Sequence, residues 1–339
     1  MSEDSSEWKV QTVLGPIAAR DLGTTDAHTH LIRLGGPLVD ASRDFLLDSV
    51  ENGVAELDYF RAAGGATVVD MTPAVPGRDL GLLAEIASRA KTNVIASTGF
   101  VDWALYPGTR QWIETGSVEE IAKLIAAEVT DGCDANNYAG PLIKRTSHCA
   151  GVIKVATGYQ VITPFQKKTI QAAAMAHLMT GAPISVHTEF GTCVLELVEL
   201  LTQEHVDPES IIVAHTFHNP DPWYQSDIAQ TGIYLVQDGP GRIKYFPESN
   251  TIEQLERFLA DGFGDQLLFA GDHSRRSYWK SYGGGPGFDY ILKSFIPKLV
   301  RLGISESAVR RILVDNPARA FRLRRPAMPL VEHGTIHKS

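Results

Sequence analysis

The sequence has few cysteines, no excess of basic residues and no long apolar run. Its three cysteines, Cys133, Cys149 and Cys193, are too few for a disulfide framework. A formal net charge of -9 argues against nucleic-acid binding and a polybasic membrane surface, because both need cationic side chains. No segment reaches the roughly 20 apolar residues of a membrane-spanning helix, and the polar start lacks the features of a signal peptide. We therefore expect a soluble cytoplasmic protein without nucleic-acid or membrane partners.

Short β-branched runs alternate with longer stretches of helical periodicity along most of the chain. Eight of these runs predict strands, which begin at Thr24, Ala66, Asn93, Ala150, Pro183, Ile211, Ile233 and Leu267. Eight strands that alternate with helices predict an α/β fold, a (β/α)8 TIM barrel with a parallel sheet. No linker divides the chain, so we expect a single domain over residues 1–339, with a leading segment at 1–20 and a C-terminal tail at 327–339.

Three predicted helices begin with residues that can cap the first turn. In each case a hydroxyl side chain is followed three positions later by Glu or Gln, which is the pattern of a capping box. The three pairs are Ser117 with Glu120, Thr163 with Gln166, and Thr251 with Gln254.

Several predicted strands carry polar residues where apolar ones are expected. His28 and His30 are two positions apart on the first strand, so they project to the same side. His187, His215 and Asp272 lie at or near the ends of the fifth, sixth and eighth strands. Because the carboxyl ends of barrel strands form the active-site face, we expect these side chains to converge there.

Lys154 interrupts the apolar run GVIKVATG on the fourth predicted strand, which is expected to be buried on both faces. An ammonium group there loses its hydration without compensation. Three explanations remain open: an ion pair with a carboxylate, a lowered pKa that leaves the amine neutral, or chemical modification. A neutral amine can take up carbon dioxide to form a carbamate, an anionic ligand with two oxygens that can bridge two cations.

Together these six side chains predict a centre for two divalent metal ions, because they are too many for one tetrahedral ion. Imidazole and carboxylate ligands favour Zn, with Mn, Co or Fe as alternatives. Taken singly, each histidine has an ordinary structural explanation, and Lys154 alone is more often ion-paired. We assign His28, His30 and Asp272 to one ion, His187 and His215 to the other, and an N6-carboxylated Lys154 and a hydroxide to the bridge between them.

Five segments resemble the phosphotriesterase family within the amidohydrolase superfamily: TDAHTHL, GVIKVATG, SVHTE, VAHT and GDHSRRSYWKSYGGGPGFDY. The similarity runs from about residue 15 to the DNPARAF segment near residue 321. It implies a distorted barrel of the amidohydrolase type that holds two divalent metals, usually Zn, at the six positions above. It also implies a homodimer and the hydrolysis of lactones or organophosphate triesters.

The RIKY segment and the residues after the eighth strand resemble a lactonase-like branch that acts on phosphorylated sugar lactones. The resemblance implies that Lys244, Arg275 and Tyr278 hold the phosphate, with Arg276 beside them. The planar guanidinium group of Arg and the ammonium group of Lys are suited to bind a phosphate or a carboxylate. The alternative is that these basic residues form a solvated loop.

The sequence departs from this branch next to two of the metal positions. Phe217 and His218 stand where the branch usually has an acidic residue and an arginine, and His273 follows Asp272 where a methionine is usual. Phe217 cannot accept a proton, so either His218 substitutes as the candidate substrate contact there or the pocket prefers a more apolar substrate. In the loop after the third strand, Trp103 and Tyr106 are candidate pocket walls.

These residues predict metal-assisted hydrolysis of a small molecule. A hydroxide between the metals attacks an ester carbonyl or a phosphorus centre, and Asp272 takes up the proton. The leading prediction is a lactonase for a phosphorylated or otherwise anionic sugar lactone. An organophosphate triester hydrolase and a non-catalytic metal- or sugar-binding barrel are the alternatives.

Overall fold

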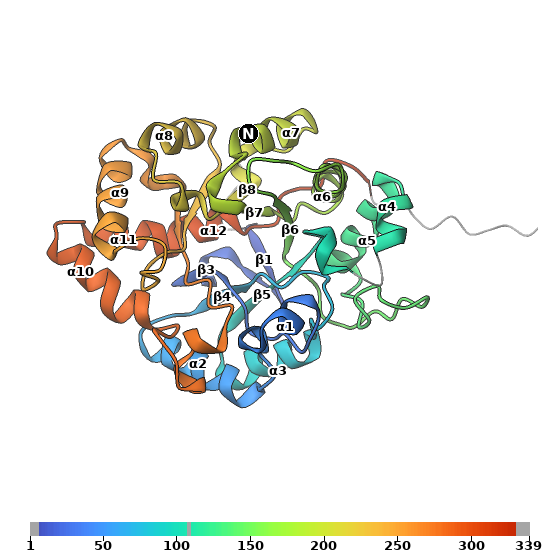
Figure 1. Ribbon diagram of the computed structural model, residues 1–339, viewed down its shortest axis with the longest axis horizontal. Coiled ribbons are helices and arrows are strands. Elements are labelled where there is room, and N and C mark those ends of the chain that lie inside the picture. Colours follow the sequence, from blue (N-terminus) through green and yellow to red (C-terminus); the bar gives the residue numbers. More distant parts are fainter. Residues whose placement is uncertain (1–6, 107–109, 330–339) are drawn as a thin grey trace, which may run out of the picture.

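The structure is a computed structural model that describes residues 7–106 and 110–329. Its centre is a sheet of eight parallel strands, each hydrogen-bonded to the next in sequence (Figure 1). The strands are β3 (Thr25–Thr29), β4 (Thr67–Asp70), β5 (Asn93–Thr98), β6 (Val152–Thr157), β7 (Ile184–Thr188), β8 (Ile211–Ala214), β9 (Tyr234–Gln237) and β10 (Leu267–Phe269).

The end of β10 returns to β3, which nearly closes the sheet into a barrel. The backbone N–H of Asp272 donates to the carbonyl of His28 at 2.8 Å. The Asp26 carboxylate accepts from the backbone N–H of Gly271, with an Oδ1–N distance of 3.1 Å. The register between β3 and β4 shifts between Asp26 and Thr29, so the barrel is distorted at the strand that carries the first histidines. The expected (β/α)8 barrel is confirmed.

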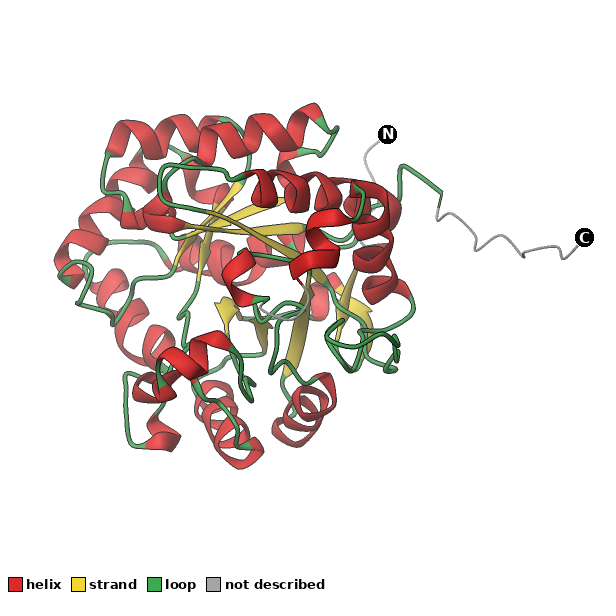
Figure 2. Cartoon of the chain, turned by 45° about the vertical axis from the view of Figure 1, so that its right-hand side comes forward, coloured by secondary structure: helices red, strands yellow, loops and turns green. Residues whose placement is uncertain are grey.

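Helices surround the strands on the outside (Figure 2). They are α1 (Pro37–Ala41), α2 (Val50–Ala62), α3 (Leu80–Ala90), α4 (Arg110–Thr115), α5 (Val118–Thr130), α6 (Pro164–Thr180), α7 (Val194–Gln203), α8 (Pro222–Gln230), α9 (Glu248–Ala260), α10 (Ile296–Arg301), α11 (Glu306–Arg310) and α12 (Asn316–Ala320). Among the described helices, none combines the length and the apolar character that crossing a membrane requires.

The leading segment contains an antiparallel hairpin of β1 (Lys9–Thr12) and β2 (Gly15–Ala18). Backbone hydrogen bonds tie it to the barrel and to the end of the chain. The N–H of Val13 donates to the carbonyl of Val94 at 2.8 Å, and the N–H of Leu323 donates to the carbonyl of Lys9 at 2.8 Å.

Two of the three expected capping boxes are present, at the starts of α5 and α6. The third is wrong. Helix α9 begins at Glu248 after Pro247, whose extended backbone sets the helix start about one turn before Thr251. Thr251 is therefore inside the helix and buried, and the side chain of Gln254 accepts a hydrogen bond from Gln225 at 2.8 Å.

A buried ion pair supports the loop that follows β4. Both terminal nitrogens of Arg78 contact the carboxylate of Glu128 in α5 at 2.8 Å, and the Glu128 carboxylate also accepts from the backbone N–H of Asp134. Arg78 Nε donates to Asn137 Oδ1 at 2.7 Å. The pair thus joins the loop after β4, which carries Val75 toward the cavity described below, to the segment that follows α5.

Replacing Arg78 with methionine is expected to destabilise the fold strongly. Arg78→Met leaves the Glu128 carboxylate buried without its counter-charge, which typically costs about 3–5 kcal/mol. The change is measured as the shift of the urea unfolding midpoint followed by circular dichroism. Arg89→Met is the matched control, because Arg89 forms an exposed pair with Glu85, and we expect an unchanged midpoint. Similar shifts of the unfolding midpoint for the two variants would contradict a stabilising role of the buried Arg78–Glu128 pair.

Candidate metal centre

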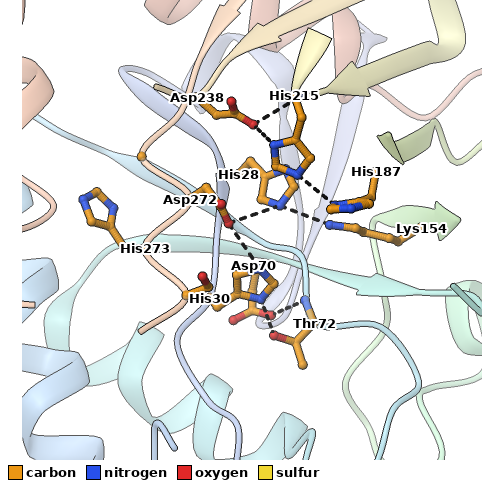
Figure 3. Close-up of polar contacts among 12 residues, drawn as sticks. His28, His30, Asp70, Thr72, Lys154, His187, His215, Asp238, Asp272 and His273 are labelled. Atoms are coloured by element: carbon orange, nitrogen blue, oxygen red, sulfur yellow. Dashed lines mark hydrogen bonds and ion pairs between the residues drawn. The ribbon is translucent and has the colours of Figure 1, made fainter. Parts of the chain in front are cut away.

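Four histidines, a lysine and an aspartate converge at the carboxyl ends of the barrel strands (Figure 3). All six are the side chains assigned to metal ligation from the sequence. They are His28 in β3, His30 just after it, Lys154 in β6, His187 in β7, His215 just after β8 and Asp272 beyond β10. The barrel thus brings residues together from positions up to 244 apart in the sequence (272 minus 28).

The first group consists of His28, His30 and Asp272. The Nε2 atoms of His28 and His30 lie 3.7 and 3.6 Å from Asp272 Oδ1. One ligand atom from each of the three residues falls within 4.8 Å of the other two. Zn–N and Zn–O bonds of about 2.0–2.2 Å place tetrahedral ligand atoms roughly 3.3 Å apart. The three atoms therefore fit around one divalent ion after small adjustments.

The second group adjoins the first through Lys154. His187 Nδ1 and His215 Nε2 are 2.8 Å apart, and Lys154 Nζ is 3.1 Å from His28 Nε2. Figure 3 shows the amine of Lys154 beside His28 of the first group and His187 of the second. Its amine is therefore placed where a two-oxygen group on Nζ could be shared by both sets.

Burial lowers the pKa of four of these nitrogen bases: His28, His30, His187 and Lys154. It lowers the pKa of His28 well below its usual value, and the charge of Lys154 lowers it further. Burial together with the charge of Arg33 lowers the pKa of His30 to about 3. It also lowers the pKa of His187, and it lowers the pKa of Lys154 to about 8. Nitrogen bases with lowered pKa values that face one another across a buried space give up protons readily to a divalent cation, which needs unprotonated donors.

Three histidines are oriented by a polar partner at the ring nitrogen that faces away from the cluster. Asp238, fully buried after β9, contacts Nδ1 of His215. Glu189 Oε2 is 3.2 Å from His187 Nε2, and Thr72 Oγ1 is 2.8 Å from His30 Nδ1. A partner on one ring nitrogen fixes the proton there and leaves the other nitrogen free for a metal.

Asp238 belongs to a compact group of charges behind the ligands. Burial tends to raise its pKa, but the contacts with His215, His218 and the Arg242 guanidinium outweigh burial and lower the pKa to about 2. His28, His215 and Asp238 also offer ligand atoms within 4.8 Å of one another. Because Asp238 contacts the far nitrogen of His215, we assign it to orientation rather than to ligation.

Arg242, in the loop after β9, contacts the other side of Asp272. Its Nη1 is 2.6 Å from Asp272 Oδ2, whereas Oδ1 faces His28 and His30. Burial acts to raise the pKa of Asp272, but the charge of Arg242 outweighs it and holds the pKa well below the usual value. Asp272 is therefore ionised, with one oxygen directed toward the metal positions.

The cluster forms the floor of a cavity of about 450 Å3. One wall is apolar, and the side toward the loop after β3 carries an arginine beside an aromatic ring. The apolar wall includes Met71, Pro73, Val75, Val101 and Leu105, and the other side includes Arg33, Leu38, Phe45 and Ser274.

Three residues of the site, Arg33, Asp238 and Arg242, were not predicted from the sequence. Asp238 carried the same signal as Asp272, because it is a carboxylate at the end of a predicted strand.

Three of the side chains predicted to hold a phosphate lie outside the cavity lining. Lys244 is exposed, with Nζ 4.8 Å from the centre of the Tyr245 ring and 5.5 Å from that of Tyr278. Arg275 packs on Phe45, with Cζ 3.9 Å from the ring centre. Since Phe45 lines the cavity, Arg275 is the member of this set that directly backs the cavity wall.

Arg276 and Tyr106 occupy places different from those expected. The Arg276 guanidinium donates to the carbonyl of Leu46 and pairs with Asp48, so it is directed toward the segment before α2. Tyr106 is buried, and its hydroxyl accepts from the backbone N–H of Val101 at 3.1 Å. A large ring with a satisfied hydroxyl is stabilised in the core, which explains why Tyr106 is not a cavity wall.

The remaining predicted contacts lie behind the site or outside the described side chains. His218 stacks between the rings of His215 and Tyr245, at centroid distances of 5.2 and 4.1 Å, and is not part of the cavity lining. Trp103 belongs to a short 3-10 helix, Trp103–Leu105, but its side chain lies outside the described part of the chain.

Comparison with known proteins decides the family. The sequence profile described as the phosphotriesterase family matches residues 8–321. The chain belongs to the phosphotriesterase family. It is therefore a member of a family of hydrolases, and the fold expected from the resemblance is confirmed.

Relatives in this family are similar over nearly the whole chain. A phospho-furanose lactonase from Mycoplasmopsis synoviae is 38% identical over 331 residues, which cover 94% of each chain. Among solved structures, an amidohydrolase from Mycoplasma synoviae has a TM-score of 0.91 at 37% identity and 95% coverage of both chains. A lactonase from Listeria monocytogenes has a TM-score of 0.86 at 34% identity, over 94% of this chain and 100% of the other.

A third solved structure carries an anion. The phosphotriesterase homology protein from Escherichia coli, crystallised with phosphate in its active site, has a TM-score of 0.80 at 31% identity. The similarity covers 89% of this chain and 99% of that protein.

Removing the charge of Asp238 is expected to weaken metal binding. In Asp238→Asn, a neutral amide replaces the ionised carboxylate that accepts from the far nitrogen of His215 and fixes the ring. Loss of such a partner typically costs about 10- to 100-fold in metal affinity. Zinc affinity is measured by competition with a chromogenic chelator, with circular dichroism to check folding. Asp221→Asn, at the start of α8, is the control with unchanged affinity. Equal affinities for Asp238→Asn and the wild type would refute the orienting role.

Proposed function

We propose that this chain hydrolyses a phosphorylated sugar lactone with the help of two divalent metal ions. The observation that carries the proposal is the convergence of four histidines, Lys154 and an ionised Asp272 on the floor of one cavity. The relatives named phospho-furanose lactonases and the phosphate in the active site of the Escherichia coli protein support a phosphorylated substrate.

The donor set fits two ions, with Zn favoured by its imidazoles and carboxylate. His28, His30 and Asp272 would hold one ion, and His187 and His215 the other. A carboxylated Lys154 would be shared between them, because its amine lies 3.1 Å from a ligand nitrogen of His28. When bound, the two ions would polarise the lactone carbonyl and acidify a water molecule.

The protein's own groups position and deprotonate the reactants. Asp272 is held from one side by Arg242 and through its backbone by His28, so its Oδ1 stays directed at the floor of the cavity. This oxygen accepts the proton of the attacking water, as a general base does. Val75 and Val101 give this cavity an apolar wall beside the position proposed for the reacting carbonyl.

The anionic group of the substrate would lie on the opposite side, toward Phe45 and Arg275. Lys244 and Tyr278 are close to one another outside the cavity lining, and a guanidinium or ammonium group suits a phosphate. A homodimer and a cytoplasmic location remain predictions from the sequence.

Carboxylation of Lys154 is testable without measuring activity. After metal loading with 13C-labelled bicarbonate, we expect one additional carbonyl signal in the carbon NMR spectrum, absent from Lys154→Met. The variant should also bind fewer than two equivalents of zinc by plasma mass spectrometry, because the shared ligand is gone. Lys298→Met, which removes a lysine paired with Glu248 outside the site, should keep both the signal and the metal. A wild type with two zinc ions and no such signal would exclude the carbamate.

Substrate class is tested by a panel of phosphorylated lactones, neutral lactones and phosphotriesters on zinc-loaded protein. We expect the highest kcat/KM for a phosphorylated furanose lactone. Asp272→Asn should lower kcat by about 10²- to 10⁴-fold, because it removes the general base, whereas Asp221→Asn should not. Faster hydrolysis of phosphotriesters would favour the organophosphate alternative. If the protein binds metal but shows no hydrolysis that is lost in Asp272→Asn, the result would favour a non-catalytic binding protein.

A further inference from the structure

Arg33 is a buried cation in the wall of the cavity. The residue is 4% exposed and lies in the segment that follows β3. Its backbone is paired with Leu47: the N–H of Arg33 donates to the Leu47 carbonyl at 2.9 Å, and the N–H of Leu47 donates back at 3.0 Å. The main chain therefore fixes where the guanidinium enters the cavity.

The Arg33 guanidinium lacks a direct counter-charge. Within the described residues, no carboxylate oxygen lies within 4.0 Å of it, and its buried Nε has no hydrogen-bond partner. Nη1 donates to the carbonyl of Ser274 at 3.3 Å. Asp70 and Asp272 act on it only at longer range. A buried cation in this state is costly unless a further acceptor is present.

The remaining contact of Arg33 does not supply that acceptor. Nη2 lies 3.1 Å from His30 Nδ1, but the same Nδ1 is 2.8 Å from Thr72 Oγ1. If His30 presents the lone pair of Nε2 to a cation, its proton sits on Nδ1 and is donated to Thr72. A protonated nitrogen cannot accept from Arg33, so Nη2 also remains available in the metal-binding tautomer.

A second guanidinium approaches the same aromatic ring. Cζ of Arg33 is 5.6 Å and Cζ of Arg275 is 3.9 Å from the centre of the Phe45 ring. Arg275 has a carboxylate partner, Asp44, at 3.7 Å, and its side chain is about a third exposed. Burial lowers the pKa of Arg33, and the charge of Arg275 lowers it further. An anion placed beside both groups would relieve their repulsion and supply the missing acceptors.

We infer that Arg33 binds the phosphate of a sugar-phosphate substrate inside the cavity and determines the preference for phosphorylated over neutral lactones. The inference rests on the proposed function and specifies it further. The phosphate lies on the Phe45 side, with Arg33 at its inner end and Arg275 at its outer end. The lactone ring then extends over the metal positions toward Lys154 on the floor and Gly158, which also lines the cavity.

The test compares one furanose lactone with and without its phosphate. For Arg33→Met we expect kcat/KM for the phosphorylated form to fall about 100-fold, mainly through KM, because a hydrogen-bonded charge pair is lost. The neutral form should change less than about 3-fold. Arg33→Lys should recover part of the loss, since an ammonium keeps the charge but not the planar fork. Arg310→Met, at an exposed position, is the control for removing a positive charge elsewhere.

Metal content is measured for every variant, because Arg33 adjoins His30. Equal losses on the two lactones, or an unchanged preference for the phosphate, would overturn the inference. If the wild type hydrolyses no lactone, the proposed function fails, and calorimetry with ribose 5-phosphate and ribose then tests Arg33 separately. If Arg33→Met binds ribose 5-phosphate more weakly but binds ribose as the wild type does, the phosphate subsite is supported. Unchanged binding of both sugars excludes it.

Discussion

The site depends on the burial of nitrogen lone pairs that face one another. Inside the barrel, Lys154 and His28 cannot both be protonated at 3.1 Å without a large electrostatic cost, and burial disfavours either charge. The strands prevent these groups from separating, because the parallel register fixes Ala156 opposite His187 and closes β10 onto His28. A fold that holds bases together in this way is stabilised by cations, so the barrel geometry itself favours the metal binding that we propose.

The departures from the lactonase-like pattern lie outside the cavity lining. Phe217 is buried against Phe258, and the ring of His273 is stacked on Phe288 at 4.6 Å, away from the ligands (Figure 3). The neighbour of Asp272 is Arg242, a group that cannot accept a proton. In the proposed mechanism, a proton taken up at Asp272 Oδ1 therefore cannot pass to Arg242 and would leave toward the leaving group or cavity water.

The strands and the six converging side chains could be predicted from the sequence, because the side chain of a polar residue within an apolar strand points to a defined face of the sheet. Lys154 and His28 are constrained by the period of two in a strand and by the shared carboxyl ends of a parallel sheet. Loop residues have no such constraint. Arg33 and Arg242 reach the site through backbone turns that their spacing does not encode, and Tyr106 was assigned to the cavity although its ring packs in the core.

The cavity is cationic on one side although the protein has a formal net charge of -9. At physiological ionic strength, charges on the surface are screened beyond about 8 Å, so the acidic exterior has little influence on an anion that has entered the cavity. Inside, the desolvated guanidinium of Arg33 is screened much less and acts at hydrogen-bond distance. Under the proposed function, selection of an anionic substrate would therefore depend on a few buried contacts, and one substitution in the cavity would change it more than many on the surface.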